Sequence, residues 1–479
     1  MFDWTLDPNL IVRTTFNIVY FAAIVGTIII IILDNRNPVK TLAWVLILMF
    51  LPVMGLIFYF FFGRTTRRER IIERKSYDRL MKKPMAEYQA QELSEVPQAY
   101  ERLIRFFWET NESFPFKGNQ IEIYTNGYDK LHALLREIQK AQSHIHLQYY
   151  IFENDAIGRL VRDTLIDKAR EGVEIRVLYD DVGSWDVSNS FFEEMRDAGI
   201  EVRSFLKVRF PLFTSRVNYR NHRKIVVIDG CVGFVGGMNL AERYIKGLSW
   251  GIWRDTHILM KGKAVHGLQT AFLLDWFFVD QTLITSSRYF PRIEFCGDAL
   301  SQIVTSDPIG PWKEIMQGLT IAITSAKKYV YIQTPYFLPT ETILAAMQSV
   351  ALAGVDVRLM LPERADNRIT HWASNSYLED VLQAGAKVYF NRKGFLHSKV
   401  MVSDDLLSTV GSTNIDFRSF EHNFEVNAFM YDMETALNLK EIFHQDQKDC
   451  RQISLKKWKK RPLHQRAIES IVRLIAPLL

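Results

Sequence analysis

Two copies of one short motif contain the residues best suited to chemistry. The first copy reads His222-x-Lys224-x4-Asp229, and the second reads His397-x-Lys399-x4-Asp404. Each copy is followed by a Gly-[Gly/Ser]-x-Asn segment that starts seven positions after its aspartate, and every residue of the second copy stands 175 positions after its counterpart. A single motif of this kind arises by chance, whereas two copies with the same internal spacing indicate a duplicated site.

The residue types in the motif suit a phosphate group. Residues two apart in an extended segment share a face, so His222 projects with Lys224, and His397 projects with Lys399. If the two copies pack about a pseudo-twofold axis, two imidazoles and two ammonium groups line one pocket. The lysines would neutralise the non-bridging oxygens of the phosphate. Further hydrogen-bond donors for the substrate are expected from Asn239, Ser412 and Asn414.

This set of residues predicts a two-step reaction on phosphorus. One imidazole attacks phosphorus to form a covalent phospho-histidine, and the other protonates the leaving alkoxide and later deprotonates the incoming alcohol. The nucleophilic nitrogen must be neutral, which a carboxylate bonded to the far ring nitrogen ensures. Asp255 and Glu425 are the candidates, each orienting the histidine of one half, although they stand 16 residues after Asn239 and 11 after Asn414. No carboxylate cluster has metal-ligand spacing, so neither a metal nor another cofactor is expected.

Asp229 and Asp404 complete the candidate catalytic set by motif. Each stands at the expected end of a strand, directly before a turn. A structural hydrogen bond or salt bridge is therefore favoured for these two aspartates over direct chemistry.

The elements that must position these residues also occur twice. Strand-like segments at 143–152, 172–178 and 199–203 recur in the same order at 329–337, 354–360 and 385–389, with helical stretches between them. Such alternation predicts parallel strands with helical crossovers. The predicted class is α/β, with two pseudo-symmetric α/β/α halves that form one catalytic unit behind an N-terminal transmembrane helical hairpin.

The hairpin is predicted from two uncharged runs, at 14–33 and 42–62. At about 1.5 Å per residue, each is long enough for a hydrocarbon core of about 30 Å. A signal peptide is disfavoured because the first 12 residues carry only acidic charge. Pro52 leaves open a second helix that bends within one leaflet. The arginine-rich segment 64–75 predicts a multi-pass protein of the bacterial inner membrane with its catalytic domain in the cytoplasm.

Composition agrees with this organisation. The 479 residues are 48% hydrophobic and 24% charged, which excludes a disordered chain, and the three cysteines have no paired spacing for a disulfide framework or a zinc site. The predicted segments are the hairpin at 1–63, a basic amphipathic connector at 64–118, the two halves at 119–290 and 291–450, and a basic amphipathic tail at 451–479. The connector could rest on the bilayer or on the globular domain, and the tail could bind anionic lipid or dock on the domain.

The duplicated motif resembles that of the phospholipase D superfamily, and the chain is similar in more detail to the bacterial cardiolipin synthases. The similarity covers nearly the whole chain, with one departure at Glu242, where an aspartate is typical. The resemblance implies a metal-free reaction through phospho-histidine, with His222 as nucleophile and His397 as acid and base. The segments that carry it are NPVKTLAW (37–44), YYIF (149–152), RNHRK (220–224), GGMN (236–239), WRDTH (253–257), TPYF (334–337) and FLHSK (395–399).

The reaction implied by this family transfers a phosphatidyl group from one phosphatidylglycerol to the terminal hydroxyl of another and releases glycerol. The motif residues alone leave open a phospholipase D-type hydrolase, or transfer to another alcohol or lipid acceptor, because water and alcohol compete for one intermediate. A non-catalytic scaffold that binds anionic lipid is disfavoured by the two intact His-Lys pairs. The expected partners are phosphatidylglycerol, other anionic phospholipids and the bacterial membrane. Nucleic acid is not expected, because a nuclease needs no membrane hairpin, and a homo-oligomer is left open.

Overall fold

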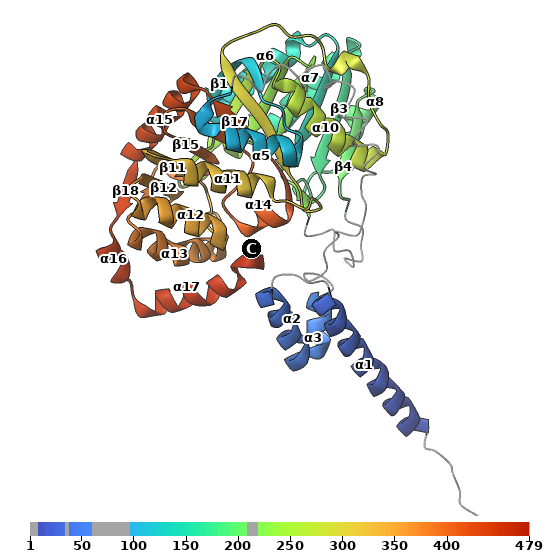
Figure 1. Ribbon diagram of the computed structural model, residues 1–479. Helices are drawn as coiled ribbons and strands as arrows, with labels where there is room; N and C mark the ends of the chain where they lie inside the picture. The colour runs from blue at the N-terminus through green and yellow to red at the C-terminus, as the bar shows by residue number, and fades with distance from the viewer. Residues whose placement is uncertain (1–7, 34–37, 60–95, 208–218, 479) are drawn as a thin grey trace, which may run out of the picture. The chain divides into compact units, whose positions relative to one another are not determined.

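The computed structural model describes residues 8–33, 38–59, 96–207 and 219–478 (Figure 1). The chain divides into two compact units. The N-terminal helices belong to the first unit, and the described residues from 96 onward belong to the second.

The N-terminal unit contains one long apolar helix and two short ones. Helix α1 (Pro8–Leu33) includes the 21-residue segment Arg13–Leu33, which is apolar and long enough to cross a membrane. The expected second spanning helix is not continuous, because the chain breaks at Leu51 between α2 (Pro38–Phe50) and α3 (Pro52–Phe58). Proline lacks the N–H that would continue the ladder of α2. The 13 residues of α2 span only about 20 Å, so the described residues contain one candidate membrane span.

The second unit is built on one continuous mixed β-sheet. Both halves contribute the same order of strands, which the edge strand β18 (Cys450–Ile453) extends in the second half. The halves join where β1 (Phe116–Tyr124) pairs with β10 (Ala299–Ser306). Within each half, three neighbouring strands of this sheet pair in parallel. They are β2 (His144–Tyr149), β3 (Glu174–Asp180) and β4 (Glu201–Phe205) in the first half and β11 (Tyr329–Gln333), β12 (Asp356–Pro362) and β13 (Lys387–Asn391) in the second. The parallel direction predicted for these segments is therefore confirmed, whereas β6 (Ile225–Ile228) and β15 (Val400–Ser403), which follow the motif residues, pair antiparallel.

In the first half the strands are β1 (Phe116–Tyr124), β2 (His144–Tyr149), β3 (Glu174–Asp180), β4 (Glu201–Phe205), β6 (Ile225–Ile228), β7 (Val232–Gly236) and β9 (His257–Lys261). In the second half they are β10 (Ala299–Ser306), β11 (Tyr329–Gln333), β12 (Asp356–Pro362), β13 (Lys387–Asn391), β15 (Val400–Ser403), β16 (Leu407–Gly411), β17 (Asn423–Tyr431) and β18 (Cys450–Ile453). Three short strands, β5 (Arg220–Asn221), β8 (Ile252–Arg254) and β14 (Gly394–Leu396), lie outside this path.

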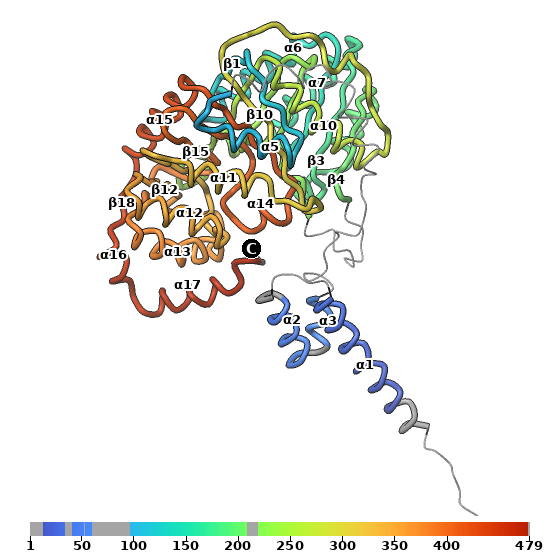
Figure 2. The backbone as a smooth tube through the Cα atoms, in the orientation of Figure 1, coloured from blue at the N-terminus to red at the C-terminus, as the bar shows by residue number. Residues whose placement is uncertain are grey.

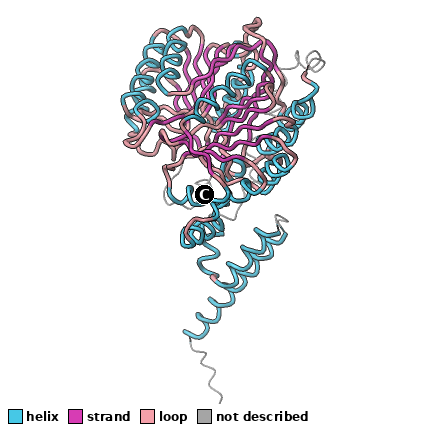
Figure 3. The backbone as a smooth tube through the Cα atoms, turned by 90° about the vertical axis from the view of Figure 1, so that its left-hand side faces the viewer, coloured by secondary structure: helices cyan, strands magenta, loops and turns pink. Residues whose placement is uncertain are grey.

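Helices cover both faces of the sheet, as Figure 3 shows. Buried side chains of α10 and α15 join apolar residues from strands of both halves in one hydrophobic core. The other face carries a separate core in each half. This arrangement confirms the predicted class of two α/β/α halves. The covering helices are α6 (Gly127–Lys140), α7 (Ala156–Arg170), α8 (Asn189–Asp197), α10 (Val265–Asp280), α11 (Glu314–Ser325), α12 (Glu341–Leu352), α13 (Arg368–Gln383) and α15 (Met433–Lys448).

The segments that flank the two halves pack onto them. Helix α5 (Glu101–Asn111) buries Phe107 with its ring centroid 4.5 Å from that of Phe429, so this part of the connector rests on the globular domain. The remainder of the connector, up to residue 95, lies outside the described residues. In the C-terminal tail, Trp458 of α16 (Leu455–Lys459) packs on Phe390, with 6.0 Å between the two ring centroids. The remaining helices are α9 (Arg243–Lys246), α14 (Phe417–Glu421) and α17 (Leu463–Ile475), with single turns at Gln98–Tyr100, Ser287–Tyr289 and Ala476–Leu478.

Candidate active site

The two histidines of the duplicated motif each bond to a carboxylate of the opposite half. His222 Nδ1 lies 3.0 Å from Oε1 and 3.1 Å from Oε2 of Glu425. His397 Nδ1 lies 2.6 Å from Oδ2 of Asp255. The two candidate acids therefore contact the two histidines, and each pair joins the first half to the second.

Short parallel ladders between the halves produce this exchange. Strand β5 pairs with β17, and the His222 N–H donates to the carbonyl of Phe424 at 2.9 Å. Strand β14 pairs with β8, and the His397 N–H donates to the carbonyl of Arg254 at 2.7 Å. In each half, the short strand before the motif histidine therefore pairs with the segment of the other half that carries the acid. The longer strand of the same half's sheet begins after the motif lysine.

Asp255 and Glu425 occupy equivalent places in the sheet despite their unequal spacing along the chain. Gly236 of the first motif pairs with His257, and Gly411 of the second pairs with Asn427. Each acid stands two residues before the partner of its motif glycine. The unequal spacing comes from a longer connection in the first half, which contains α9 and β8.

The two motif lysines are buried beside the histidines. Lys224 Nζ donates to the main-chain carbonyl of His222, and Lys399 Nζ donates to that of His397. Burial lowers the pKa of Lys224 to about 7 and that of Lys399 to about 8. Lys399 adds to the lowering at Lys224 by charge repulsion, which places the two ammonium groups in one electrostatic site.

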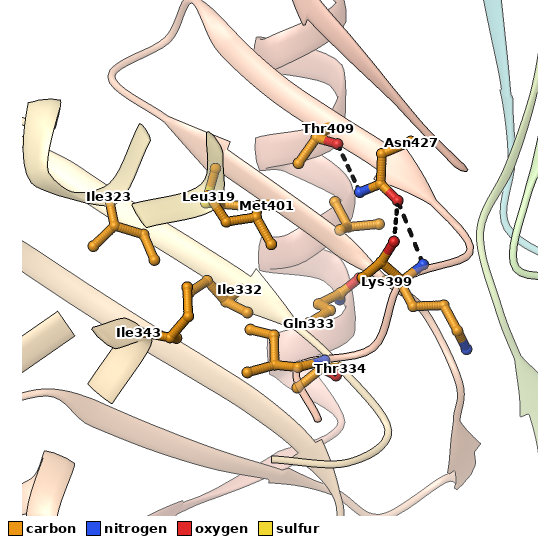
Figure 4. A pocket seen from close by; sticks show the side chains of 13 residues that line it. Leu319, Ile323, Ile332, Gln333, Thr334, Ile343, Lys399, Met401, Thr409 and Asn427 are labelled. Atoms are coloured by element: carbon orange, nitrogen blue, oxygen red, sulfur yellow. Dashed lines mark hydrogen bonds between the residues drawn. The ribbon is translucent and has the colours of Figure 1, made fainter. Parts of the chain in front are cut away.

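A small cavity lies behind Lys399 in the second half, among Leu319, Ile323 and other core side chains (Figure 4). On its polar side, Asn427 donates to Thr409 at 3.1 Å and accepts from Thr413 at 2.7 Å. The ammonium group of Lys399 lies away from the apolar side chains in this view. Burial is the largest cause of the lowered pKa of Lys399.

Both imidazoles are held neutral, and both keep a small exposed surface. Burial lowers the pKa of His222, the two lysines lower it further, and Glu425 opposes them. Burial and Lys399 lower the pKa of His397 to about 3, against the opposing effect of Asp255. The side chains of His222 and His397 are 12% and 10% exposed. A phosphate can therefore reach them from solvent.

Both carboxylates are held charged. Burial would raise the pKa of Glu425, but His222 and Lys224 lower it below its usual value. Burial would likewise raise the pKa of Asp255, and Lys399 and His397 lower it. A charged carboxylate accepts the Nδ1 proton of its histidine, so Nε2 keeps its lone pair for chemistry.

The three predicted substrate-binding residues differ in what they contact. The Asn239 side chain accepts from the Ile151 N–H at 3.1 Å and donates to Tyr244 Oη at 2.6 Å. The Ser412 hydroxyl donates to Glu425 Oε2, so it supports the acid of the first histidine rather than facing substrate directly. Asn414 is buried, and its Oδ1 has no hydrogen-bond donor among the described residues.

Two buried arginines bind the segments where the halves pair, at the ladders β5–β17 and β8–β14. Sequence reasoning did not single out either arginine. Arg223 donates to the Glu425 carbonyl at 3.0 Å and to Asp275 of α10 at 2.7 Å. Arg254 donates to the carbonyl of Asp255 at 2.7 Å and to Ser398 Oγ at 3.1 Å. Arg254 also bonds Asp446 of α15 through two nitrogens, at 2.7 and 3.0 Å. The only available signal was position, because each arginine stands next to a motif histidine or acid.

Aromatic rings form walls around the two histidines. The Tyr150 ring lies 5.0 Å from that of His222 and 5.2 Å from Lys224 Nζ. The Trp253 ring lies 5.3 Å from that of His397. These rings add to the burial that lowers the pKa of both imidazoles.

The structure places Asp229 and Asp404 away from the imidazoles. The four residues of β6, about 13 Å of strand, separate Asp229 from Lys224, and β15 separates Asp404 from Lys399 in the same way. The Asp229 carboxylate accepts the backbone N–H groups of residues 142, 143 and 144 at 2.8–2.9 Å. The Asp404 carboxylate accepts those of residues 327, 328 and 329 at 2.6–2.9 Å. This geometry supports a structural role for both aspartates.

Replacing Asp229 by asparagine is expected to lower stability more than activity. Asparagine tolerates the left-handed backbone at this position (φ 52°) but retains only one of the two accepting oxygens. We expect the free energy of unfolding to fall by about 1–3 kcal/mol, while turnover by the folded protein changes less than about threefold. Asp404→Asn is the matched variant in the other half. Thermal unfolding in detergent and turnover of the same samples test this, and unchanged stability with turnover largely lost would contradict it.

Comparisons with known proteins agree with the duplicated architecture. A family model described as "Cardiolipin synthase, PLD-like domain" matches residues 134–253 and 319–447, and one described as "Phospholipase_D-nuclease N-terminal" matches residues 21–64. The chain is 40% identical over 470 residues to a cardiolipin synthase of Geobacillus kaustophilus, covering 97% of this chain and 94% of the relative. It is 41% identical over 464 residues to the major cardiolipin synthase of Bacillus subtilis, covering 94% of this chain and 96% of that protein.

A solved structure shares the fold. The phosphatidylserine synthase of Haemophilus influenzae superposes with a TM-score of 0.59 at 14% sequence identity. The match covers 79% of this chain and 98% of that one. At this identity the likeness concerns the fold alone.

Proposed function

The chain belongs to the cardiolipin synthase family of the phospholipase D superfamily, and on that premise we propose that it condenses two phosphatidylglycerol molecules to cardiolipin and glycerol. Members of this family are membrane-associated phosphatidyltransferases with phospholipid substrates. The observation that carries the proposal is the pair of cross-half His-carboxylate contacts beside two buried lysines, in a chain about 40% identical over nearly its full length to cardiolipin synthases.

In the first step, Nε2 of His222 attacks phosphorus and the bond from phosphorus to the glycerol oxygen breaks. His397 gives its Nε2 proton to that oxygen, and glycerol leaves. In the second step, His397 takes the proton of the terminal hydroxyl of a second phosphatidylglycerol. The freed oxygen attacks phosphorus, the phosphorus–nitrogen bond breaks, and His222 is regenerated.

Charge balance in the site explains how His397 can act as a general acid although its pKa is low in the empty site. Two ammonium groups there face two carboxylates, and both imidazoles are neutral. A bound phosphodiester adds one negative charge, and a proton on His397 restores the balance. Substrate binding therefore raises the pKa of His397 towards the range that a general acid needs.

The remaining site residues have supporting parts in this proposal. Lys224 and Lys399 neutralise the non-bridging oxygens, and Glu425 and Asp255 orient the two imidazoles. Asn239 and Asn414 flank the phosphate site, and Ser412 acts through Glu425. We further propose that α1 spans the bacterial inner membrane and that the catalytic unit lies in the cytoplasm, from the arginine-rich segment 64–75.

The reaction is tested with detergent-purified protein and phosphatidylglycerol alone, in the presence of a chelator and without added metal. Mass analysis of the lipids and of released glycerol is expected to show cardiolipin with an equimolar amount of glycerol. Phosphatidic acid in place of cardiolipin would establish a hydrolase. Product that forms only after another lipid or alcohol is added would establish a different acceptor.

The pH dependence of kcat/KM is expected to report the loss of the ammonium protons of Lys224 and Lys399. Their charged forms bind the phosphodiester, and in the empty site they lose their protons as pH rises through about 7 and about 8. Because kcat/KM reports groups of the free enzyme, it is expected to fall above this range by about tenfold per pH unit for each lysine that must be charged. Lys399→Arg, whose side chain stays charged, is expected to move part of this fall to higher pH. An unchanged alkaline limb in that variant would contradict the assignment.

A further inference from the structure

Helix α17 buries a charged side chain against the protein and leaves most of its large apolar side chains in solvent, with Val472 packed on the core. Glu469 is only 2% exposed, and its carboxylate accepts from Arg461 at 2.6 Å. By contrast, Leu463 and Leu474 are each 80% exposed. A helix that packs on a soluble domain normally does the reverse. The outer face of α17 is defined here by its exposed apolar residues, Leu463, Ile468, Ile471, Leu474 and Ile475.

Polar contacts hold the helix in this orientation. Arg473 donates to Asp380 at 2.9 Å and to the carbonyl of Ser376 at 3.1 Å, and its guanidinium lies 4.2 Å from the ring of Tyr377. All three partners belong to α13, beside which α17 runs (Figures 1 and 2). Turning the outer face inward would break these bonds and expose Glu469, so the apolar residues are fixed outward.

Exposed positive charge lies next to this face. Lys456, Lys457, Lys459 and Lys460 are exposed immediately before the helix, and Arg466 is exposed on the helix itself. An apolar helix face bordered by basic residues is the pattern of a helix that lies in the interface of an anionic bilayer. A second copy of the chain fits the face less well, because symmetric pairing would bring two basic clusters together.

We propose that the outer face of α17 is a docking site that seats the catalytic unit on an anionic phospholipid surface. The apolar side chains enter the acyl-chain boundary, and the lysines contact lipid phosphates. The proposal goes beyond the proposed function, because docking does not depend on which product the enzyme makes. It gives the catalytic unit a contact with the bilayer separate from α1.

Lipid contact is measured on the full-length protein in vesicles. Ile471→Cys carries a bimane fluorophore in a chain whose native cysteines, Cys231, Cys296 and Cys450, are replaced by serine. Met433→Cys is the matched control, since Met433 is an apolar residue, 60% exposed, on α15, which packs on the opposite face of the sheet. Phosphatidylglycerol with brominated acyl chains is expected to quench the label at 471 at least about twofold and to leave the label at 433 unquenched.

Three results would overturn the proposal. The first is an unquenched label at 471, and the second is equal quenching in vesicles of zwitterionic lipid alone. The third is a disulfide between two copies of the unlabelled Ile471→Cys protein in place of lipid contact. Each is observed without turnover, so failure of docking is separate from failure of the proposed reaction.

A second variant tests the consequence for catalysis. Ile471→Glu combined with Leu474→Glu is expected to lower turnover of phosphatidylglycerol in dilute vesicles about tenfold, because the unit no longer docks. Turnover of a short-chain phosphatidylglycerol dissolved as monomers is expected to stay unchanged, which also shows that the variant folds. Met433→Glu combined with Leu437→Glu, on α15, is the control and should retain vesicle turnover. Equal loss on monomeric and vesicle substrate, or no loss on either, would contradict docking by α17.

Discussion

His222→Ala and His397→Ala are each expected to lower the turnover of phosphatidylglycerol by about 10⁴-fold or more while the protein stays folded and membrane-bound. Loss of His222 removes the atom that would bond to phosphorus. Loss of His397 leaves the departing glycerol oxygen without a positioned proton donor. Product formation by purified variants is the measurement, with thermal unfolding in detergent as the control for folding. Substantial turnover by either variant would refute the two-histidine mechanism.

An activated substrate separates the two roles. In a phosphatidyl ester of a nitrophenol, the nitrophenolate leaves without protonation. The first step on this substrate therefore needs the nucleophile but no general acid. His397→Ala is therefore expected to release one equivalent of nitrophenol and to accumulate a phosphatidyl-enzyme that mass spectrometry locates on His222. His222→Ala is expected to release none. The reverse pattern would assign the nucleophile to His397, since the pseudo-symmetric site offers either imidazole to phosphorus.

Much of the architecture could be predicted because the chain repeats itself. The constant offset between the two motifs implied two similar halves with their motifs in contact, and the structure shows two such halves joined by the pairs His222–Glu425 and His397–Asp255. The parallel strands were predicted from their alternation with helices, but the direction of β6 and β15 was not, because short antiparallel strands have the same apolar character as parallel ones. The break of the second apolar helix at Leu51 depends on how the chain continues around Pro52, which hydropathy alone does not decide.

Contacts between the halves could not be derived from the spacing of residues. The sequence predicted Asp255 and Glu425 as orienting acids but gave no means of choosing a histidine for each. That choice depends on the short ladders β5–β17 and β8–β14, which connect segments about 140 to 200 residues apart. Arg223 and Arg254 were missed for the same reason, since their acceptors lie on helices and strands distant in the chain.

Glu425→Gln is expected to lower turnover about 10³-fold, and Asp255→Asn is expected to do the same. Each amide keeps the shape of the acid but no longer accepts the Nδ1 proton reliably, so the wrong tautomer of the histidine becomes populated. Removing the negative charge of Glu425 also lowers the pKa of His222 further, because that carboxylate opposes the effects of burial and of the lysines. The acid limb of kcat/KM in Glu425→Gln is therefore expected to move to lower pH. A merely structural role for the carboxylate would not move this limb.

The nitrophenyl substrate also tests which histidine each of the two acids orients. Glu425 bonds His222, so Glu425→Gln is expected to slow the burst of nitrophenol that accompanies formation of the phosphatidyl-histidine. Asp255 bonds His397, so Asp255→Asn is expected to leave the burst nearly intact and to slow the later transfer to an alcohol. Acids that served the histidine of their own half would give the opposite assignment, with Asp255→Asn impairing the burst. Because both variants remove one buried carboxylate at equivalent places in the sheet, each is the control for the other, and a difference between them reports which histidine each acid orients.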